Sequence, residues 1–342
     1  MWHHRGRFQD SKAGGKVKKA LITGVSGQDG RHLVHLLMKM DYEIVGTVSK
    51  PSSVLPVKDF FSSSRVEIIH ADLTNLSQLM DIVTLHKPDE IYNLAALSHV
   101  GRSFIEPELT ADITGLGALR LLEAVRSSGR SDNMKMYQAS SSEMFGRVNQ
   151  SPQDEETPFN PISPYGVAKT FAHNTCRSYR DMYEIKVSCG ILFNHEGEFR
   201  SQEFVTRKIT SNVARIALGR QKTFSLGNLE ARRDWGYAGD YVKAMWKMMQ
   251  CDFADDYVIA TGLSHTVLDF LLTALEAAGL EKNVEKYVTY DPQMKRPREA
   301  DLLVGNSSKA SRILNWKAEK SFHELVQLMV ENDLRIERAI EL

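Results

Sequence analysis

The stretch with the strongest structural signal reads Gly24-Val25-Ser26-Gly27-Gln28-Asp29-Gly30. It follows an apolar segment, residues 17–23, that predicts a short strand, and it precedes apolar residues at helical spacing between residues 33 and 40. In such a strand–turn–helix unit, the glycines let the backbone approach a pyrophosphate, and N–H groups at the helix N-terminus bind it. The alternative is a plain strand-to-helix turn. We expect a nucleotide-binding site here.

The chain continues as an alternation of apolar strands and amphipathic helices. Strands are expected at residues 42–48, 65–71, 90–94, 134–139 and 186–193, and helices at residues 76–86 and 107–127. This alternation is typical of a Rossmann-like, doubly wound parallel α/β sheet. The second strand ends in Ser49-Lys50, without the acidic residue that bonds the ribose 2′-hydroxyl of NAD. The strand end therefore favours NADP, with NAD as the alternative.

A second chemical signal lies on the helix expected after Ser163-Pro164, because serine suits the N-cap and proline suits the first helical position. Tyr165 and Lys169 are four residues apart, so both project from one face of this helix. A neighbouring ammonium favours the phenolate, which would lower the tyrosine pKa and make Tyr165 a general base. An ordinary amphipathic helix can carry the same pair. Glu143, on the loop upstream, favours the catalytic interpretation.

Composition excludes several classes of function. The chain has 342 residues, with 43 Lys and Arg against 43 Asp and Glu, so its net charge is zero and nothing favours nucleic acid or membrane as a partner. No apolar run is long enough for a membrane span. Three widely spaced cysteines (Cys176, Cys189 and Cys251) predict free thiols in the cytoplasm, without a metal site. The polar residues 1–16 are expected to be a disordered extension or an expression remnant.

The second half of the chain reads as a substrate-binding region. Amphipathic helices are expected at residues 203–218, 268–278 and 322–334. Basic residues cluster here, and they are either solvated surface charges or phosphate ligands, since arginine binds phosphate bidentately. They are Arg207, Lys208, Arg215, Arg232, Arg233, Lys295, Arg296 and Arg298.

From about Lys18 to its last helix, the chain resembles the GDP-mannose 4,6-dehydratases of the extended short-chain dehydrogenase/reductase superfamily. The most specific motifs are Gln28-Asp29 between glycines, Phe193-Asn194-His195-Glu196 and Arg233-Asp234-Trp235-Gly236. Further matching segments are residues 93–100, 139–146, 163–169, 203–209, 240–242 and 296–299. The resemblance implies a dinucleotide-binding domain at residues 17–193 with 234–262 and a nucleotide-sugar-binding domain at residues 194–233 with 263–342.

The resemblance implies an NAD(P)-dependent hydro-lyase that converts GDP-mannose to GDP-4-keto-6-deoxy-mannose in deoxysugar biosynthesis. Oxidation at C4 is followed by loss of water across C5 and C6 and by return of the hydride to C6. Tyr165 would take the O4 proton, Lys169 would lower the tyrosine pKa, and Glu143 would remove the C5 proton. Ser141 stands where the family has a catalytic threonine. A homodimer or homotetramer is implied.

The resemblance and the glycine-rich turn together predict two further sets of residues. The cofactor set is Gly24, Ser26, Gly27, Gln28, Asp29, Gly30, Ser49, Lys50, Asp72, Leu73, Leu94, Ala95, Ala96, Ser98, Tyr165, Lys169, His195 and Arg200. The substrate set is Ser98, Ser141, Glu143, Asn194, Val205, Lys208, Leu226, Gly227, Arg233, Arg296 and Glu299.

Several departures from the family pattern keep alternatives open. Ser49-Lys50 replaces an arginine pair, the arginine-bearing loop that follows is shortened, residues 197–201 replace a Ser-Pro-Arg-Arg-Gly segment, and Leu109 replaces a tyrosine. Because these changes cluster around cofactor and sugar, a GDP-manno-heptose is an alternative substrate. A nucleotide-sugar C4 epimerase or reductase would need Tyr165 and Lys169 but no acid at Glu143. A non-catalytic nucleotide sensor would need none of the three.

Overall fold

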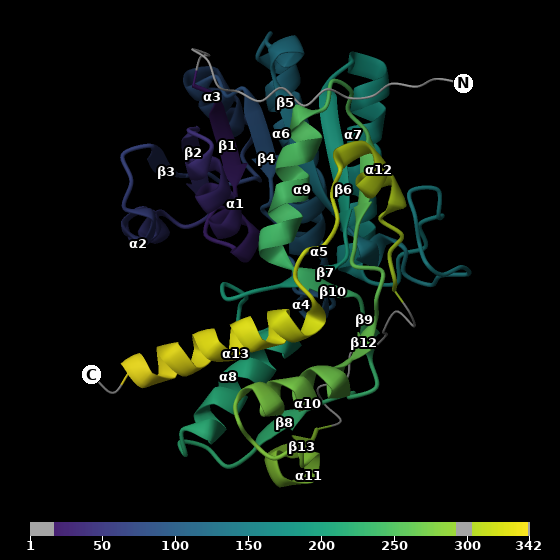
Figure 1. Ribbon diagram of the computed structural model, residues 1–342. Helices are drawn as coiled ribbons and strands as arrows, with labels where there is room; N and C mark the ends of the chain where they lie inside the picture. The colour runs from purple at the N-terminus through teal and green to yellow at the C-terminus, as the bar shows by residue number, and fades with distance from the viewer. Residues whose placement is uncertain (1–16, 292–302, 341–342) are drawn as a thin grey trace.

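The computed structural model describes residues 17–291 and 303–340. Its central feature is a seven-stranded sheet in which all neighbouring strands pair in parallel. In spatial order the strands are β11 (Asp256–Ile259), β6 (Lys186–Leu192), β5 (Lys135–Ser141), β4 (Glu90–Asn93), β1 (Lys19–Thr23), β2 (Glu43–Val48) and β3 (Val66–His70). The order reverses between β1 and β4, where a doubly wound sheet opens a crevice at its carboxyl edge. The predicted sheet is confirmed (Figure 1).

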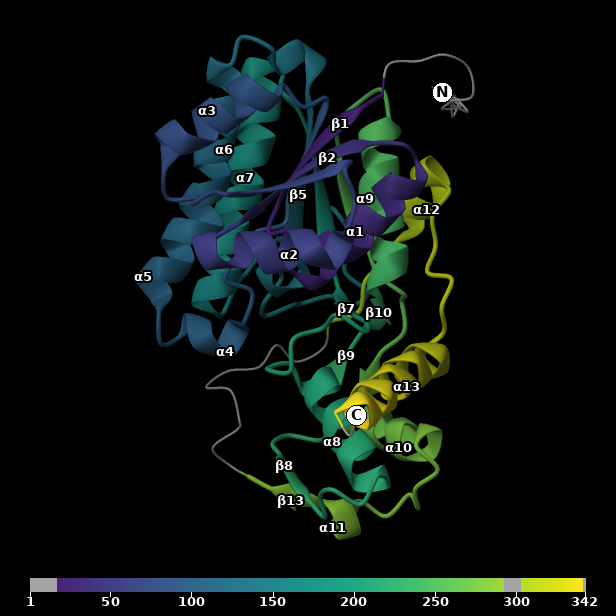
Figure 2. The ribbon, with the colours of Figure 1, turned by 90° about the vertical axis from the view of Figure 1, so that its left-hand side faces the viewer.

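Helices cover both faces of this sheet, as Figure 2 shows edge-on. One face carries α1 (Gln28–Lys39), α9 (Ala238–Gln250) and α12 (Ser308–Leu314), and the other carries α3 (Leu76–His86), α6 (Gly117–Ser127) and α7 (Pro164–Tyr183). Successive strand residues point to opposite faces. Ala20 and Ile22 thus join the core under α1 and α9, while Leu21 joins the core under α3 and α6. Burial on both sides explains why β1 reads as a continuous apolar run.

The helix expected at residues 107–127 is divided. It consists of α5 (Pro107–Thr110), a π-helical segment (Ala111–Leu116) and α6. The wide turn is stabilised by Arg120, whose guanidinium donates to the Asp112 carbonyl oxygen at 3.2 Å and to Asp112 Oδ1 at 2.7 Å. The hydrophobic periodicity of the sequence does not reveal such a contact, so the π-helical turn could not be predicted from it. Sequence analysis also missed α2 (Val54–Phe61) after β2, and it did not identify α9 and α12.

The remaining elements form a smaller region below the carboxyl edge of the sheet (Figure 1). Its helices α8 (Val205–Ala217), α10 (Val267–Ala277) and α13 (Phe322–Ala339) pack on one another around a core that includes Trp235, Phe270 and Leu271. The other elements are β8 (Phe224–Leu226), β9 (Arg232–Arg233), β12 (His265–Thr266), β13 (Val288–Tyr290) and α11 (Val284–Tyr287).

Two short strands connect this region to the sheet edge: β7 (Asn194–Glu196), directly after β6, pairs with β10 (Trp235–Tyr237), directly before α9. Further along the chain, α12 packs on β11 and α9. The division into two domains stays a prediction. Within the described residues, no helix is both long and apolar enough to cross a bilayer.

Candidate active site

A cavity of about 390 Å³ opens at the carboxyl edge of the sheet. It collects most of the predicted site: Gly24, Ser26, Gly27, Gln28, Asp29, Gly30, Ser49, Asp72, Leu73, Leu94, Ala95, Ala96, Ser98, Ser141, Glu143, Tyr165, Lys169, Asn194, His195 and Arg200 all line it. Sequence analysis did not name Thr47, Ser140, Leu192 and Phe204, which also line it. Lys50, Val205, Lys208, Leu226, Gly227 and Arg233 are not among its lining residues. Arg296 and Glu299 lie outside the described residues.

The glycine-rich end of this cavity fits a dinucleotide. Gly24 has a φ of +69°, and a Cβ on it would lie 2.9 Å from the Ala95 Cα, so the turn requires glycine and leaves the backbone bare. The helix α1 begins at Gln28 with Gly27 as its N-cap, and no side chain caps its N–H groups. An uncapped helix N-terminus lined by bare backbone is a site for a pyrophosphate.

Buried side chains beneath the cavity hold three strands in register. Thr23 Oγ1 donates to Asn93 Oδ1 at 2.7 Å, and Asn93 Nδ2 donates to Gln138 Oε1 at 2.8 Å. The Thr23 hydroxyl also accepts from the backbone N–H groups of Leu94 and Ala95, each at 3.1 Å. The network joins the ends of β1 and β4 to the middle of β5, so it fixes the backbone against which a cofactor would lie. Sequence analysis missed it because these residues are far apart in the chain.

Asp29 and His195 form a partly buried pair between α1 and β7. His195 Nε2 lies 2.8 Å from Asp29 Oδ2, and His195 Nδ1 lies 2.8 Å from the Phe193 carbonyl oxygen. Burial alone would raise the pKa of Asp29, but the His195 charge and hydrogen bond lower this pKa to about 2. Burial alone would lower the pKa of His195, but Asp29 raises it. The imidazole of His195 stacks on the Tyr241 ring, and its contact with Asp29 links the sheet edge to the phosphate end of the cavity.

Arg200 reaches the cavity from the loop after β7. Its Nε lies 2.9 Å from Glu196 Oε2, and its guanidinium carbon lies 3.5 Å from the centre of the Phe204 ring. The loop is anchored from the smaller region, because Arg207 Nη1 donates to the carbonyl oxygens of Glu198 (2.8 Å) and Arg200 (2.9 Å). The segment 197–201, which departs from the family pattern, is therefore held in place and contributes Arg200 to the cavity wall.

The helix α7 delivers Tyr165 and Lys169 to the other wall. Its N-cap is Ser163, whose Oγ accepts from the Gly166 N–H at 3.0 Å, as the Ser-Pro pair predicted. Gly166 permits a close approach, since a Cβ there would lie 2.6 Å from the Glu143 carbonyl oxygen. The first turn of α7 and the loop carrying Glu143 can therefore touch, which brings the tyrosine and the carboxylate to one place.

The electrostatics of the Tyr165–Lys169 pair differ from the prediction. Lys169 Nζ donates to the Ala139 carbonyl oxygen at 2.7 Å and lies 5.7 Å from the centre of the Tyr165 ring. Burial raises the pKa of Tyr165, although a hydrogen bond with Ser141 lowers it. Burial lowers the pKa of Lys169 to about 8, although Asp29 opposes this. The pKa of Tyr165 is thus shifted in the opposite direction to the predicted one, because desolvation of the phenolate outweighs the hydrogen bond with Ser141 and the charge of Arg200.

Glu143 and Ser141 complete this wall. The Ser141 hydroxyl accepts from the Glu143 N–H at 3.2 Å, which fixes the short turn between the two side chains. Ser141 also bonds Tyr165, and Glu143 lies close enough to raise the Tyr165 pKa. A hydroxyl, a carboxylate, a phenol and an ammonium thus converge on one end of a cavity whose other end fits a dinucleotide. This set can transfer protons at adjacent carbon atoms of a substrate.

The basic residues of the smaller region divide into two groups. Arg207 forms a buried ion pair with Asp333 (Nη2–Oδ1 2.7 Å), and Arg215 pairs with Glu337 (Nε–Oε1 2.8 Å). Both are occupied with holding α8 to α13. Lys208 lies beside them but faces Asp291, and burial lowers its pKa. The Asp291 N–H donates to the Leu226 carbonyl oxygen at 2.9 Å, which places Lys208 near the predicted substrate residue Leu226.

Comparisons with known proteins give one consistent result. A family model described as GDP-mannose 4,6 dehydratase matches residues 21–329. GDP-mannose 4,6 dehydratase 2 of Arabidopsis thaliana is 46% identical over 93% of this chain and 87% of its own. The human GDP-mannose 4,6 dehydratase is 42% identical over 96% of this chain and 95% of its own.

Solved structures show the same fold at lower identity. The UDP-glucose 4-epimerase of Thermotoga maritima, solved with UDP-glucose, has a TM-score of 0.82 at 24% identity over 94% of this chain and 99% of its own. The dTDP-glucose 4,6-dehydratase of Bacillus anthracis, solved with NAD, has a TM-score of 0.80 at 20% identity over 94% of this chain and 98% of its own.

Proposed function

This chain belongs to the GDP-mannose 4,6-dehydratase family, and we infer that it is a hydro-lyase that converts GDP-mannose to GDP-4-keto-6-deoxy-mannose with a nicotinamide cofactor. The observation that carries this conclusion is Glu143 beside Tyr165 and Lys169 on one cavity wall. Oxidation at C4 alone requires only the tyrosine and the lysine. Loss of water additionally requires an acid or base near C5 and C6, and Glu143 supplies one. The alternative readings as epimerase, reductase or heptose enzyme are not favoured.

We propose the following roles for the residues of this chain. When bound, the oxidised nicotinamide supplies a hydride acceptor and a positive charge, which favours the Tyr165 phenolate. Tyr165 takes the proton from the sugar O4, and the Lys169 ammonium stabilises the phenolate. The resulting 4-ketone acidifies the C5 proton, which Glu143 removes. The protonated Glu143 then assists departure of the C6 hydroxide as water, and Tyr165 gives the O4 proton to C5 as the hydride returns to C6. Ser141 hydrogen-bonds the reacting oxygen beside Tyr165.

The remaining site assignments are proposals: those for the cavity lining rest on position, and those for the smaller region rest on the family's motifs. Residues 24–30 hold the pyrophosphate of the cofactor, and Asp72 and Leu73 lie beside its adenine. His195 and Arg200 contact the cofactor from the β7 side. Asn194, Lys208 and Arg233 bind the GDP moiety, with Val205, Leu226 and Gly227 beside it.

NADP is the proposed cofactor, with NAD possible. Ser49 lines the cavity at the end of β2 without an acid beside it, and Lys50 follows. A further cation, Arg31, lies beside the cavity residue Ser26. Its Nε donates to the Ser26 carbonyl oxygen at 3.0 Å, and its guanidinium carbon lies 4.4 Å from the centre of the Phe60 ring. These cations suit a 2′-phosphate better than a ribose hydroxyl.

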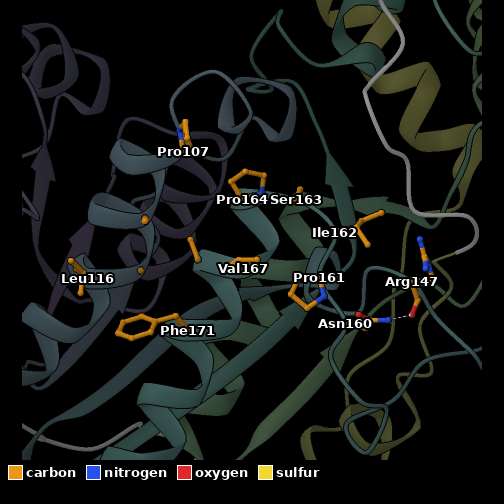
Figure 3. Close-up of a pocket in the computed structure, with 13 residues that line it drawn as sticks. Pro107, Leu116, Arg147, Asn160, Pro161, Ile162, Ser163, Pro164, Val167 and Phe171 are labelled. Carbon is orange, nitrogen blue, oxygen red and sulfur yellow. Dashed lines mark hydrogen bonds between the residues drawn. The ribbon is translucent and has the colours of Figure 1, made fainter.

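We also propose that two copies of the chain associate through α5, the π-helical segment and α7. An apolar hollow of about 840 Å³ is formed by these elements and the loop before α7, and it is lined by Leu116, Val167 and Phe171 among others (Figure 3). Val167 and Phe171 are 55% and 44% exposed, which is unusual for apolar side chains on one continuous face.

The enzyme would work in the cytoplasm, in keeping with its three free cysteines.

The test is incubation of the purified protein with GDP-mannose, without added reductant, followed by mass spectrometry of the nucleotide sugar. We expect a product lighter by one water. A parallel reaction with GDP-manno-heptose serves as the matched control for the sugar. Loss of water from the heptose alone would replace the substrate, and an isomer of unchanged mass would indicate an epimerase instead.

A further inference from the structure

Three side chains of α7 face the strand β5 at a regular spacing. Tyr165, Lys169 and His173 are four residues apart and therefore lie along one face of the helix. They meet three consecutive residues of β5. Tyr165 bonds Ser141, Lys169 Nζ donates to the Ala139 carbonyl oxygen at 2.7 Å, and His173 Nδ1 lies 2.9 Å from Ser140 Oγ. The first two contacts belong to the proposed catalytic machinery, whereas the third has no assigned role.

The third contact is buried and firmly held. His173 is 1% exposed and Ser140 is 3% exposed, and the Phe159 ring packs against the imidazole at 5.1 Å with an interplanar angle of 87°. Ser140 also lines the cofactor cavity, directly before Ser141. A hydrogen bond in such surroundings has no competing water, so it constrains the distance between the helix and the strand.

The other side of the imidazole faces two further elements. His173 Nε2 lies 3.6 Å from Asp256 Oδ2 on β11, and Cys189 of β6 raises the His173 pKa against the lowering effect of burial. Asp256 is itself held by Arg180 (Nη2–Oδ1 2.6 Å) and by Arg177 (Nε–Oδ2 3.6 Å). The imidazole is thus fixed from β5, β6 and β11.

The same cluster could be considered for a metal ion, because one ligand atom from each of His173, Cys189 and Asp256 lies within 4.8 Å of the others. Arg180 argues against this. Its guanidinium contacts Asp256 at 2.6 Å and lies 3.9 Å from Cys189 Sγ, so a positive charge already occupies the place where a cation would bind. The cluster is better explained as a support for His173.

We propose that His173 is a positioning residue for the dehydration: its hydrogen bond to Ser140 fixes α7 against β5, and this sets the placement of Tyr165 and Lys169 at the reacting carbon. The proposal rests on the proposed function of the site. It predicts that losing the bond impairs the chemical step more than substrate binding, because most of the proposed contacts to the GDP moiety come from the smaller region. A small misplacement of catalytic groups costs about ten- to hundredfold in rate.

The test compares two substitutions of one position. Asparagine carries a polar atom near the position of the imidazole Nδ1, so His173→Asn keeps a partner for Ser140, whereas His173→Leu removes it. We expect His173→Leu and Ser140→Ala each to lower kcat at least tenfold with little change in KM for GDP-mannose. His173→Asn should retain most of the wild-type kcat. The double variant His173→Leu with Ser140→Ala should be no slower than either single variant.

A purely structural role would give a different result. In that case His173→Leu and His173→Asn would lower the melting temperature, kcat of the folded fraction would stay at the wild-type value, and the effects at positions 140 and 173 would add. A wild-type kcat in the folded fraction, or additive effects at positions 140 and 173, would overturn the proposal.

A second measurement does not depend on turnover. Hydrogen exchange of the amides at the start of α7 should be faster in His173→Leu than in the wild type, and close to the wild type in His173→Asn. Unchanged exchange in His173→Leu would overturn the proposal even if the wild type failed to dehydrate GDP-mannose. Failure of the wild-type reaction alone would instead count against the proposed function.

Discussion

The cavity at the sheet edge and the smaller region below it use charged residues in opposite ways. At the sheet edge, Lys169 and Glu143 line the cavity, and Lys169 Nζ donates to the Ala139 carbonyl oxygen rather than to a carboxylate. In the smaller region, Arg207 and Arg215 are committed to ion pairs with Asp333 and Glu337. A basic residue in a motif that binds phosphate can therefore either bind a ligand or hold two helices together through an ion pair. The difference lies in whether a carboxylate of the same chain already occupies it.

The largest expected effect is at the cavity, where Glu143→Gln removes the proposed acid and base. We expect water loss from GDP-mannose to fall about 10²- to 10⁴-fold, because glutamine can neither take the C5 proton nor return one. Cofactor affinity should stay at the wild-type value. Mass spectrometry of the nucleotide sugar measures the first quantity and a cofactor titration the second. Glu198→Gln is the control for the loss of a carboxylate, because Glu198 lies on the loop after β7 and does not line the cavity. Water loss at the wild-type rate in Glu143→Gln would remove Glu143 from the mechanism.

The next effect is on stability and lies in the smaller region. Arg207→Ala leaves Asp333 buried without its cation, so we expect the free energy of unfolding to fall by about 3–5 kcal/mol. Arg215 is 35% exposed at its side chain, and Arg215→Ala should cost far less. Denaturant unfolding of both variants measures the difference. Equal losses would mean that burial of the ion pair does not set its contribution to stability. The distinction between structural and ligand-binding basic residues would then need another basis.

A smaller effect concerns pH at the cavity. Burial lowers the pKa of Lys169 to about 8, so the ammonium is present below that value and is lost as the pH rises through it. Because the ammonium supports the Tyr165 phenolate, we expect kcat to fall about tenfold for each pH unit above the Lys169 pKa. A pH–rate profile measures this limb. Lys208, which lies in the smaller region, should not contribute: Lys208→Met should keep the same alkaline limb, whereas a shifted limb would reassign it.

Local patterns and long-range contacts differ in how well the sequence predicts them. The turn from Gly24 to Gly30 and the Ser163-Pro164 helix start are local patterns, and their geometry follows from neighbouring residues. The partner of Arg207 is Asp333, 126 positions away, and the partner of His173 is Ser140 on another element. No local pattern marks such pairs. The burial that raises the Tyr165 pKa is likewise a property of the assembled cavity, which is why the sequence predicted the opposite direction.

The smallest expected effect tests how the cavity reads the cofactor. Ser49→Arg places a guanidinium at the end of β2, where it can bind a 2′-phosphate bidentately. We expect the ratio of NADP affinity to NAD affinity to rise about tenfold, since one charge-assisted contact contributes about 1.5 kcal/mol. Calorimetric titration of the cofactor-free protein with both dinucleotides measures the ratio. Ser64→Arg, at an exposed serine outside the cavity lining, controls for the added charge. An unchanged ratio in Ser49→Arg would mean that the phosphate is bound elsewhere. Arg31, held between Ser26 and Phe60, would then be the residue to replace.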